Sequence, residues 1–138
     1  MMLTGREYAF IGDAVWALVV KEQLILNHTR FGQQIHIASA HYLSAPVQAQ
    51  LFLTLEANCF FTEDELAIYK KGRNIKVTKR NSHENITVYR QASGFEAIIG
   101  YLYFNGNMAR IQKIFSYLLE VKENERETTS KCVGGEKD

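Results

Sequence analysis

The sequence predicts an all-α protein that forms a single domain. Its 138 residues include one proline, Pro46, so long stretches lack the residue that most often interrupts helices. No segment shows the sustained alternation of apolar and polar residues that is typical of a half-buried strand. Several apolar stretches instead follow residue pairs that are typical of helix N-termini. A chain of this length is expected to form one domain.

Capping residues predict the helices of the first half. A Ser or Thr followed three residues later by Glu forms a capping box, and this pattern begins at Thr4 and at Thr62. Ser44 before Pro46 is typical of an N-cap with proline in the first turn. These signals predict helices over residues 5–26, 44–57 and 62–72, with Gly72 as the C-terminal stop of the last one. Residues 31–43 are expected to form a further helix between the first two.

The second half is expected to hold two more helices. Residues 73–83 are polar and basic and are predicted to form a loop. A long helix is expected over 84–105, because Asn105-Gly106-Asn107 is a helix-breaking sequence. The last helix, over 108–122, places apolar residues on one face: Ile111, Ile114, Phe115, Leu118 and Leu119.

The domain is therefore predicted to span residues 1–122, and the composition excludes several classes of protein. Residues 123–138 carry almost no apolar surface and are expected to form a disordered tail. With 46% hydrophobic and 22% charged residues, the chain as a whole is too apolar for a disordered protein. No stretch of 18 residues is apolar throughout, which argues against a membrane span, and no secretory leader pattern is present. We therefore expect a cytoplasmic protein without a membrane partner.

Two apolar stretches each carry a single carboxylate. Residues 8–20 read YAFIGDAVWALVV, in which Asp13 is the only charged residue. Residues 92–104 read ASGFEAIIGYLYF, in which Glu96 is the only charged residue. A helix that is apolar nearly all round is expected to be central and buried. An ionised carboxylate in such a place is costly unless it is paired, protonated or bound to a cation.

Two interpretations of these carboxylates stay open on the residues alone. If the two helices pack together, a divalent cation between Asp13 and Glu96 would offset their repulsion, and oxygen ligands suit Mg²⁺ or Mn²⁺. Alternatively, each acid pairs with a basic side chain from elsewhere, such as Lys21, Arg73 or Arg90.

Glycines accompany both acids. Gly12 precedes Asp13, and Gly94 and Gly100 flank Glu96. Glycine within a helix costs roughly 0.5–1 kcal/mol relative to alanine, so it usually has a packing reason there. We expect these small residues to let the two helices approach closely.

A cationic segment is hidden by the nearly neutral total of 16 basic and 15 acidic residues. Between residues 66 and 90 only Glu84 opposes the basic side chains, which leaves this segment at +6. Such a segment suits contacts to nucleic-acid phosphates, although a solvated lysine-rich loop is the alternative. The seven basic residues are Lys70, Lys71, Arg73, Lys76, Lys79, Arg80 and Arg90.

These motifs, in this order, resemble the ribonuclease III family. YAFIGDAVW, at residues 8–16, resembles the signature helix of that family, and SGFEAIIGYLY, at 93–103, resembles its second acidic motif. KKGRN, at 70–74, and TVYRQASGFEAIIGY, at 87–101, are closer still to the Mini-III ribonucleases. Those proteins are bacterial catalytic domains without an appended double-stranded-RNA-binding domain. The resemblance covers most of residues 5–122 and implies a ribonuclease III-like helical endonuclease domain.

The resemblance implies roles for particular residues. Carried over by position, Asp13 and Glu96 are the catalytic and metal-binding residues, with Mg²⁺ as the cofactor and Mn²⁺ as its substitute. Two further acids of the family pattern are missing, because Ala9 and Ser93 stand in their places. Mini-III proteins show similar substitutions, so this is a character of the subfamily. The implied RNA-binding residues are Lys70, Lys71, Arg73, Asn74, Lys76, Lys79 and Arg80.

The implied activity is metal-dependent cleavage of double-stranded or structured RNA by a homodimer. The substrate implied for the subfamily is the precursor of large-subunit (23S) ribosomal RNA, with a ribosomal protein as a candidate helper. Two alternatives stay open: a catalytically silent RNA-binding or dimerisation module of the same fold, and a helical interaction domain whose acids form internal salt bridges. Retention of both Asp13 and Glu96 favours the enzyme.

Overall fold

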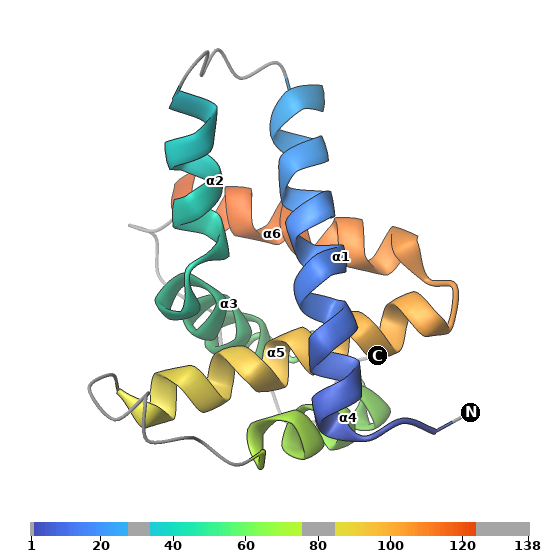
Figure 1. The fold of residues 1–138 in the computed structure, drawn as a ribbon. Helices are drawn as coiled ribbons and strands as arrows, with labels where there is room; N and C mark the ends of the chain where they lie inside the picture. Colours follow the sequence, from blue (N-terminus) through green and yellow to red (C-terminus); the bar gives the residue numbers. More distant parts are fainter. Residues whose placement is uncertain (1, 28–33, 76–84, 124–138) are drawn as a thin grey trace.

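The structure, a computed structural model, describes residues 2–27, 34–75 and 85–123. Within these residues the only regular elements are helices, which confirms the predicted fold class (Figure 1). The predicted tail lies outside the described residues, apart from Glu123 at the end of the last helix. The helices are α1 (Gly5–Leu26), α2 (Ile35–Leu43), α3 (Ala45–Ala57), α4 (Glu63–Arg73), α5 (Ile86–Phe104) and α6 (Met108–Glu123).

The predicted N-caps form as expected. The Thr4 hydroxyl accepts from the Glu7 amide at 3.1 Å, while the Thr4 amide donates to the Glu7 carboxylate at 3.0 Å. The same reciprocal pair forms at Thr62 at the start of α4. Ser44 accepts from an α3 amide and Pro46 lies in the first turn. These caps satisfy N–H groups that would otherwise lack partners at the helix starts.

The predicted stop at Gly72 was wrong. α4 continues to Arg73, with Asn74 as its C-cap, so Gly72 lies inside the helix. It is buried against α5, where an added Cβ would lie 2.5 Å from the Ala97 Cβ and 2.9 Å from the Ser93 carbonyl oxygen. Glycine is therefore needed for the close approach of α4 to α5, a long-range contact that local sequence signals do not show. The described part of the predicted 73–83 loop is limited to residues 73–75.

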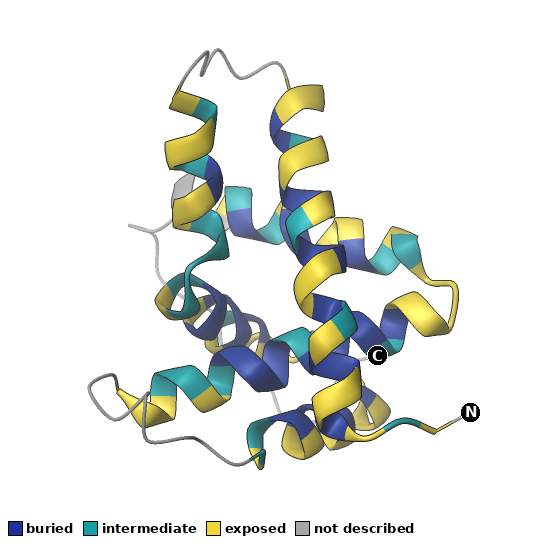
Figure 2. Cartoon of the chain, viewed as in Figure 1, coloured by how far each residue is buried: buried dark blue, intermediate teal, exposed yellow. Residues whose placement is uncertain are grey.

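α5 is the central helix of the fold. α1, α3, α4 and α6 all pack against it, and α2 lies beside α1 and contacts α3 (Figure 1). Trp16 of α1 is fully buried and meets Phe95 of α5 edge-to-face, with ring centroids 5.0 Å apart. α6 buries its predicted apolar face, with Leu119 only half-buried at its margin. Burial is concentrated where α5 crosses its neighbours (Figure 2). None of the described helices is both long and apolar enough to cross a bilayer.

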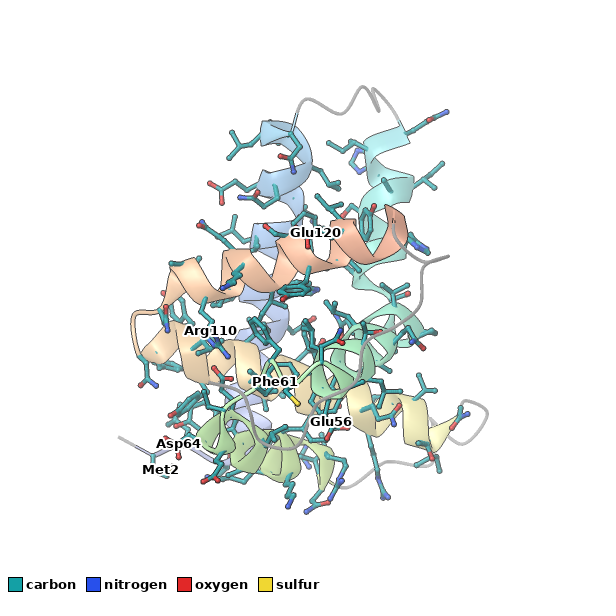
Figure 3. All side chains as sticks on the ribbon, turned by 180° about the vertical axis from the view of Figure 1, so that it is seen from behind. Met2, Glu56, Phe61, Asp64, Arg110 and Glu120 are labelled. Atoms are coloured by element: carbon teal, nitrogen blue, oxygen red, sulfur yellow. The ribbon has the colours of Figure 1, made fainter. Side chains whose placement is uncertain are left out.

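A buried ion pair joins α4 to α6. Glu65, which closes the α4 capping box, forms a bidentate pair with the Arg110 guanidinium. Arg110 also donates to the Phe60 carbonyl at 2.9 Å and lies over the Phe60 ring at 4.2 Å. Figure 3 shows Arg110 between α6 and the loop before α4. One carboxylate thus both caps a helix and neutralises the cation beside it, a contact that sequence reasoning missed.

Candidate active site

The site is built on the crossing of α1 and α5. An added Cβ on Gly12 would lie 1.8 Å from the Glu96 carbonyl oxygen, and one on Gly100 would lie 2.0 Å from the Tyr8 carbonyl oxygen. The two backbones therefore touch, and no side chain fits between them at these positions. Because Gly12 precedes Asp13 in α1 and Gly100 follows Glu96 in α5, the crossing places the two acids at one point. This confirms the packing role expected for Gly12 and Gly100.

Gly94 has a different role from the one expected. An added Cβ there would lie 2.5 Å from the Tyr69 ring of α4. Gly94 therefore allows the close approach of α4 to α5, and not that of α1. α5 consequently uses glycines on two of its sides, which is why it can serve as the central helix.

Asp13 and Glu96 face each other as a carboxylate pair. Burial raises the pKa of Glu96, and the adjacent Asp13 charge, together with a hydrogen bond between the two groups, raises it further, to about 8. Glu96 is half-buried, whereas Asp13 is exposed. The expectation of two acids in an apolar interior is therefore only partly met, because one face of α1 is open to solvent. Solvent and substrate can reach Asp13 directly, whereas Glu96 is partly shielded by the surrounding helices.

Gln48 of α3 belongs to the same site and was missed from the sequence. Its side chain is 2% exposed, and its amide nitrogen donates to the Leu43 carbonyl oxygen at 3.2 Å. It also lies within hydrogen-bonding reach of Glu96, where it lowers the pKa of that carboxyl and so favours its ionised form. An amide nitrogen has two hydrogens and can serve both acceptors. No local signal distinguishes Gln48 from the exposed Gln50 two residues on.

The internal ion pairs considered from the sequence do not form. Among the described residues, neither Asp13 nor Glu96 makes a salt bridge, and Lys21, Arg73 and Arg90 are not their partners. The two acids instead have each other as charged neighbours. That arrangement is unfavourable when both are ionised, and a cation between them would relieve it.

The donor set fits a hard divalent cation in part. Within residues 2–27, 34–75 and 85–123, no cluster of three or more His, Cys, Asp or Glu side chains forms. Two carboxylates are sufficient for Mg²⁺, which commonly keeps several water ligands and is bound through one or two carboxylates plus substrate phosphates. Ala9 and Ser93, at the positions of the missing acids, are both buried. Ala9 packs with Ile68 and Ala97, so small residues contribute to the core at these positions.

The predicted RNA-binding residues fall into four groups. Lys70 is exposed at the end of α4. Lys71 is exposed too, but its ammonium donates to the Leu3 carbonyl oxygen at 3.0 Å and so holds the N-terminal segment. Arg73 is half-buried over the Tyr69 ring, and Asn74 follows as the α4 C-cap. The remaining three, Lys76, Lys79 and Arg80, lie outside the described residues.

Comparisons with known proteins show which family and fold the chain shares. Residues 6–107 match the family model of the ribonuclease III domain. The chain is 32% identical to the Mini-ribonuclease 3 of Streptococcus pneumoniae, over 88% of this chain and 95% of that protein. It is 38% identical to the Mini-ribonuclease 3 of Brevibacillus brevis, over 85% and 86% of the two chains. A crystal structure of a Fusobacterium nucleatum protein is also similar, with a TM-score of 0.72 and 25% identity over 86% of this chain and 93% of that one.

Proposed function

The chain belongs to the ribonuclease III family, among the Mini-ribonuclease 3 enzymes, and we propose that Asp13 and Glu96 are its catalytic residues. It is accordingly an endoribonuclease, a hydrolase that acts on RNA. The observation that supports this assignment of the site is the meeting of Asp13 and Glu96 at the α1–α5 crossing. The family is generally dependent on divalent metals, which fits a site made of opposed carboxylates.

The cofactor in this proposal is Mg²⁺, with Mn²⁺ as a substitute, held by Asp13 and Glu96. When bound, such an ion supplies a water nucleophile at neutral pH and neutralises charge at the scissile phosphate. The exposed Asp13 presents its oxygens to solvent and substrate, while Glu96 is backed by the buried Gln48. Gln48 favours the ionised form of Glu96, which is the form that binds a cation. Since Ala9 and Ser93 offer no carboxylate, water and RNA phosphate would complete the coordination.

The substrate in this proposal is double-stranded RNA within the precursor of 23S ribosomal RNA. Duplex RNA is recognised mostly by shape and by phosphate and 2′-hydroxyl contacts, and the +6 segment over residues 66–90 suits such contacts. The enzyme would act in the cytoplasm, where that precursor is made. A ribosomal protein bound to the precursor is a further partner in the proposal. The RNA-binding side chains would be those of Lys70, Lys71, Arg73, Asn74, Lys76, Lys79 and Arg80.

Metal removal tests the proposed chemistry. The wild-type chain is expected to cleave a duplex RNA in Mg²⁺ or Mn²⁺, to lose all cleavage in excess chelator, and to recover it when Mg²⁺ is restored. Denaturing gels of an RNA labelled on each strand in turn would measure this. A single-stranded RNA of the same sequence is the control and should remain intact. Absence of cleavage with every divalent metal would favour the silent RNA-binding module instead.

A second copy of the chain is the proposed protein partner. Phe10, Ala14 and Leu18 recur every four residues and are all exposed on one face of α1. Phe10 is 81% exposed and Leu18 61%, and with Ala14 they form a contiguous apolar stripe, which is the feature that marks an interaction surface. Phe10 also lines an apolar cavity of about 390 Å³ that extends to Phe104. A two-fold axis repeats one patch on both subunits, so each Phe10 could enter the cavity of the other.

This face also passes next to the carboxylate pair, since Asp13 lies between Phe10 and Ala14 in α1. A dimer formed through it would therefore bring two sites to one RNA duplex, one for each strand.

Phe10→Asp is expected to convert a dimer into a monomer. Light scattering should give twice the 15.8 kDa chain mass for the wild type and the single mass for the variant. Ile37→Asp is the matched control, because Ile37 is also exposed, at 71%, but lies on α2. A wild-type mass of one chain, or a Phe10→Asp variant that stays dimeric, would contradict the proposed interface.

A further inference from the structure

A polar cavity lies between the end of α4 and the first half of α5. Its volume is about 260 Å³. It is separate from the carboxylate pair, because Arg90 precedes Glu96 by six residues, about 9 Å along the α5 axis. Its lining residues are Tyr69, Arg73, Asn74, Thr87, Arg90 and Gln91.

The lining has the chemistry of an anion site. Arg73 and Arg90 each present a planar fork of N–H donors, and the amides of Asn74 and Gln91 add neutral donors. Among the residues that the structure describes, no carboxylate lines the cavity and neither guanidinium forms an ion pair. Two cations around one cavity repel each other until an anion lies between them. A phosphate group matches guanidinium geometry and accepts several such bonds at once.

The position of Arg73 is set by the core. Its guanidinium lies 5.7 Å from the centre of the Tyr69 ring, and Tyr69 is itself buried and stacked on Phe52 at 3.8 Å. Gly94 allows α5 to lie directly against the same Tyr69 ring. The two helices that carry the arginines are therefore held in one arrangement, so little ordering is needed when an anion binds.

The α5 N-terminus does not account for this site. The Asn85 side chain accepts from the amides of Thr87 and Val88 at 2.9 and 3.3 Å, so these N–H groups are already satisfied. An anion in the cavity would be held by the arginine and amide side chains.

We propose that this cavity binds one backbone phosphate of the RNA duplex, a phosphate other than the one that is cleaved. The inference rests on the proposed function, since it takes duplex RNA as the ligand. It adds Arg90 and Gln91 of α5 to the RNA-binding residues and assigns Arg73 and Asn74 to one shared contact. The site positions the duplex and reads no base sequence.

Binding measured without cleavage tests the site. In an Asp13→Asn background, Arg90→Ala is expected to raise the Kd for a duplex RNA roughly tenfold at 0.1 M salt. The slope of log affinity against log salt should become less steep by about 1. Arg90→Lys should lose part of this affinity, because it keeps the charge without the fork. Lys113→Ala on α6 is the matched control, as an exposed cation that does not line the cavity, and should change neither quantity.

Different failures have different meanings. If Arg90→Ala and the control bind RNA with the same affinity and slope while the wild type still cleaves RNA, the phosphate site is wrong and the proposed function stands. If the wild type cleaves no duplex with any metal, the proposed function itself fails. Inorganic phosphate should shift the Gln91 side-chain amide signal in NMR spectra of the wild type but not of Arg90→Ala. Such a shift combined with an unchanged RNA salt slope would identify a site for free anions and overturn the RNA assignment.

Discussion

Replacing either carboxylate with its amide, in Asp13→Asn or Glu96→Gln, is expected to slow RNA cleavage strongly and to stabilise the metal-free protein near pH 8. Bound metal contributes several kcal/mol to phosphodiester hydrolysis, so losing one of two ligands should slow cleavage about a thousandfold. Single-turnover cleavage at saturating enzyme would measure this. The stability gain has a separate cause, which lies in the pKa of Glu96.

Glu96 has a pKa of about 8 in the folded protein against 4.5 as the ordinary value. Between these pH values the folded state keeps a proton that the unfolded chain has lost. The free energy of unfolding of the metal-free wild type should therefore fall as pH rises from about 4.5 and level off above about 8. Each pKa unit corresponds to about 1.4 kcal/mol, so the total change is on the order of a few kcal/mol.

The two amide variants should differ in this pH profile. Glu96→Gln removes the titrating group, so the free energy of unfolding should no longer depend on pH in this range. Asp13→Asn removes only the charge repulsion on Glu96, whose burial still raises its pKa, so a weaker pH dependence should remain. Urea unfolding in chelator from pH 5 to 9 would show both effects. Glu22→Gln, an exposed acid on the same helix, is the control and should match the wild type in cleavage and stability. A flat wild-type profile, or undiminished cleavage by Asp13→Asn, would contradict this account of the site.

Gly12→Ala is expected to destabilise the fold by about 3 kcal/mol and to separate the two acids. The new Cβ would lie 1.8 Å from a backbone carbonyl oxygen of Glu96, so the helices must move apart. Overpacking costs about 1–3 kcal/mol and occasionally more. The cost should be at the high end here, because the new methyl group meets backbone atoms, which cannot move aside as a side chain can. Alanine has the better helix propensity, by up to about 1 kcal/mol, so any net loss of stability comes from the clash. We expect the melting temperature to fall by roughly 10 °C.

Gly94→Ala is the control that isolates the active site. It clashes with Tyr69 of α4 instead, so it should also lower stability while leaving the α1–α5 crossing in place. Single-turnover cleavage at saturating enzyme, measured well below both melting temperatures, should fall strongly in Gly12→Ala, because the acids no longer converge, and much less in Gly94→Ala. Equal cleavage by the two variants would show that this crossing does not set the geometry of the acids.

The helices could be predicted because their signals are local. Capping boxes at Thr4 and Thr62 and the Ser44 cap act within four residues, and each begins a helix where expected. Gly72 shows the limit of such reasoning, since a glycine near a helix end resembles a stop but is required for packing against α5. A residue's role in long-range packing cannot be read from its sequence neighbours.

The sequence by itself determined that this protein is helical, that two lone carboxylates lie in apolar stretches, and that a cationic segment precedes the second. Only the tertiary structure decided which face of α1 is open to solvent, because an exposed apolar stripe and a core stripe have the same spacing. The structure also brought Gln48 to Glu96 and placed Arg73 and Arg90 around one cavity. These residues come from three helices. The meeting depends on how closely α5 can be approached, and for α1 and α4 that distance is set by glycines, which have no side chains.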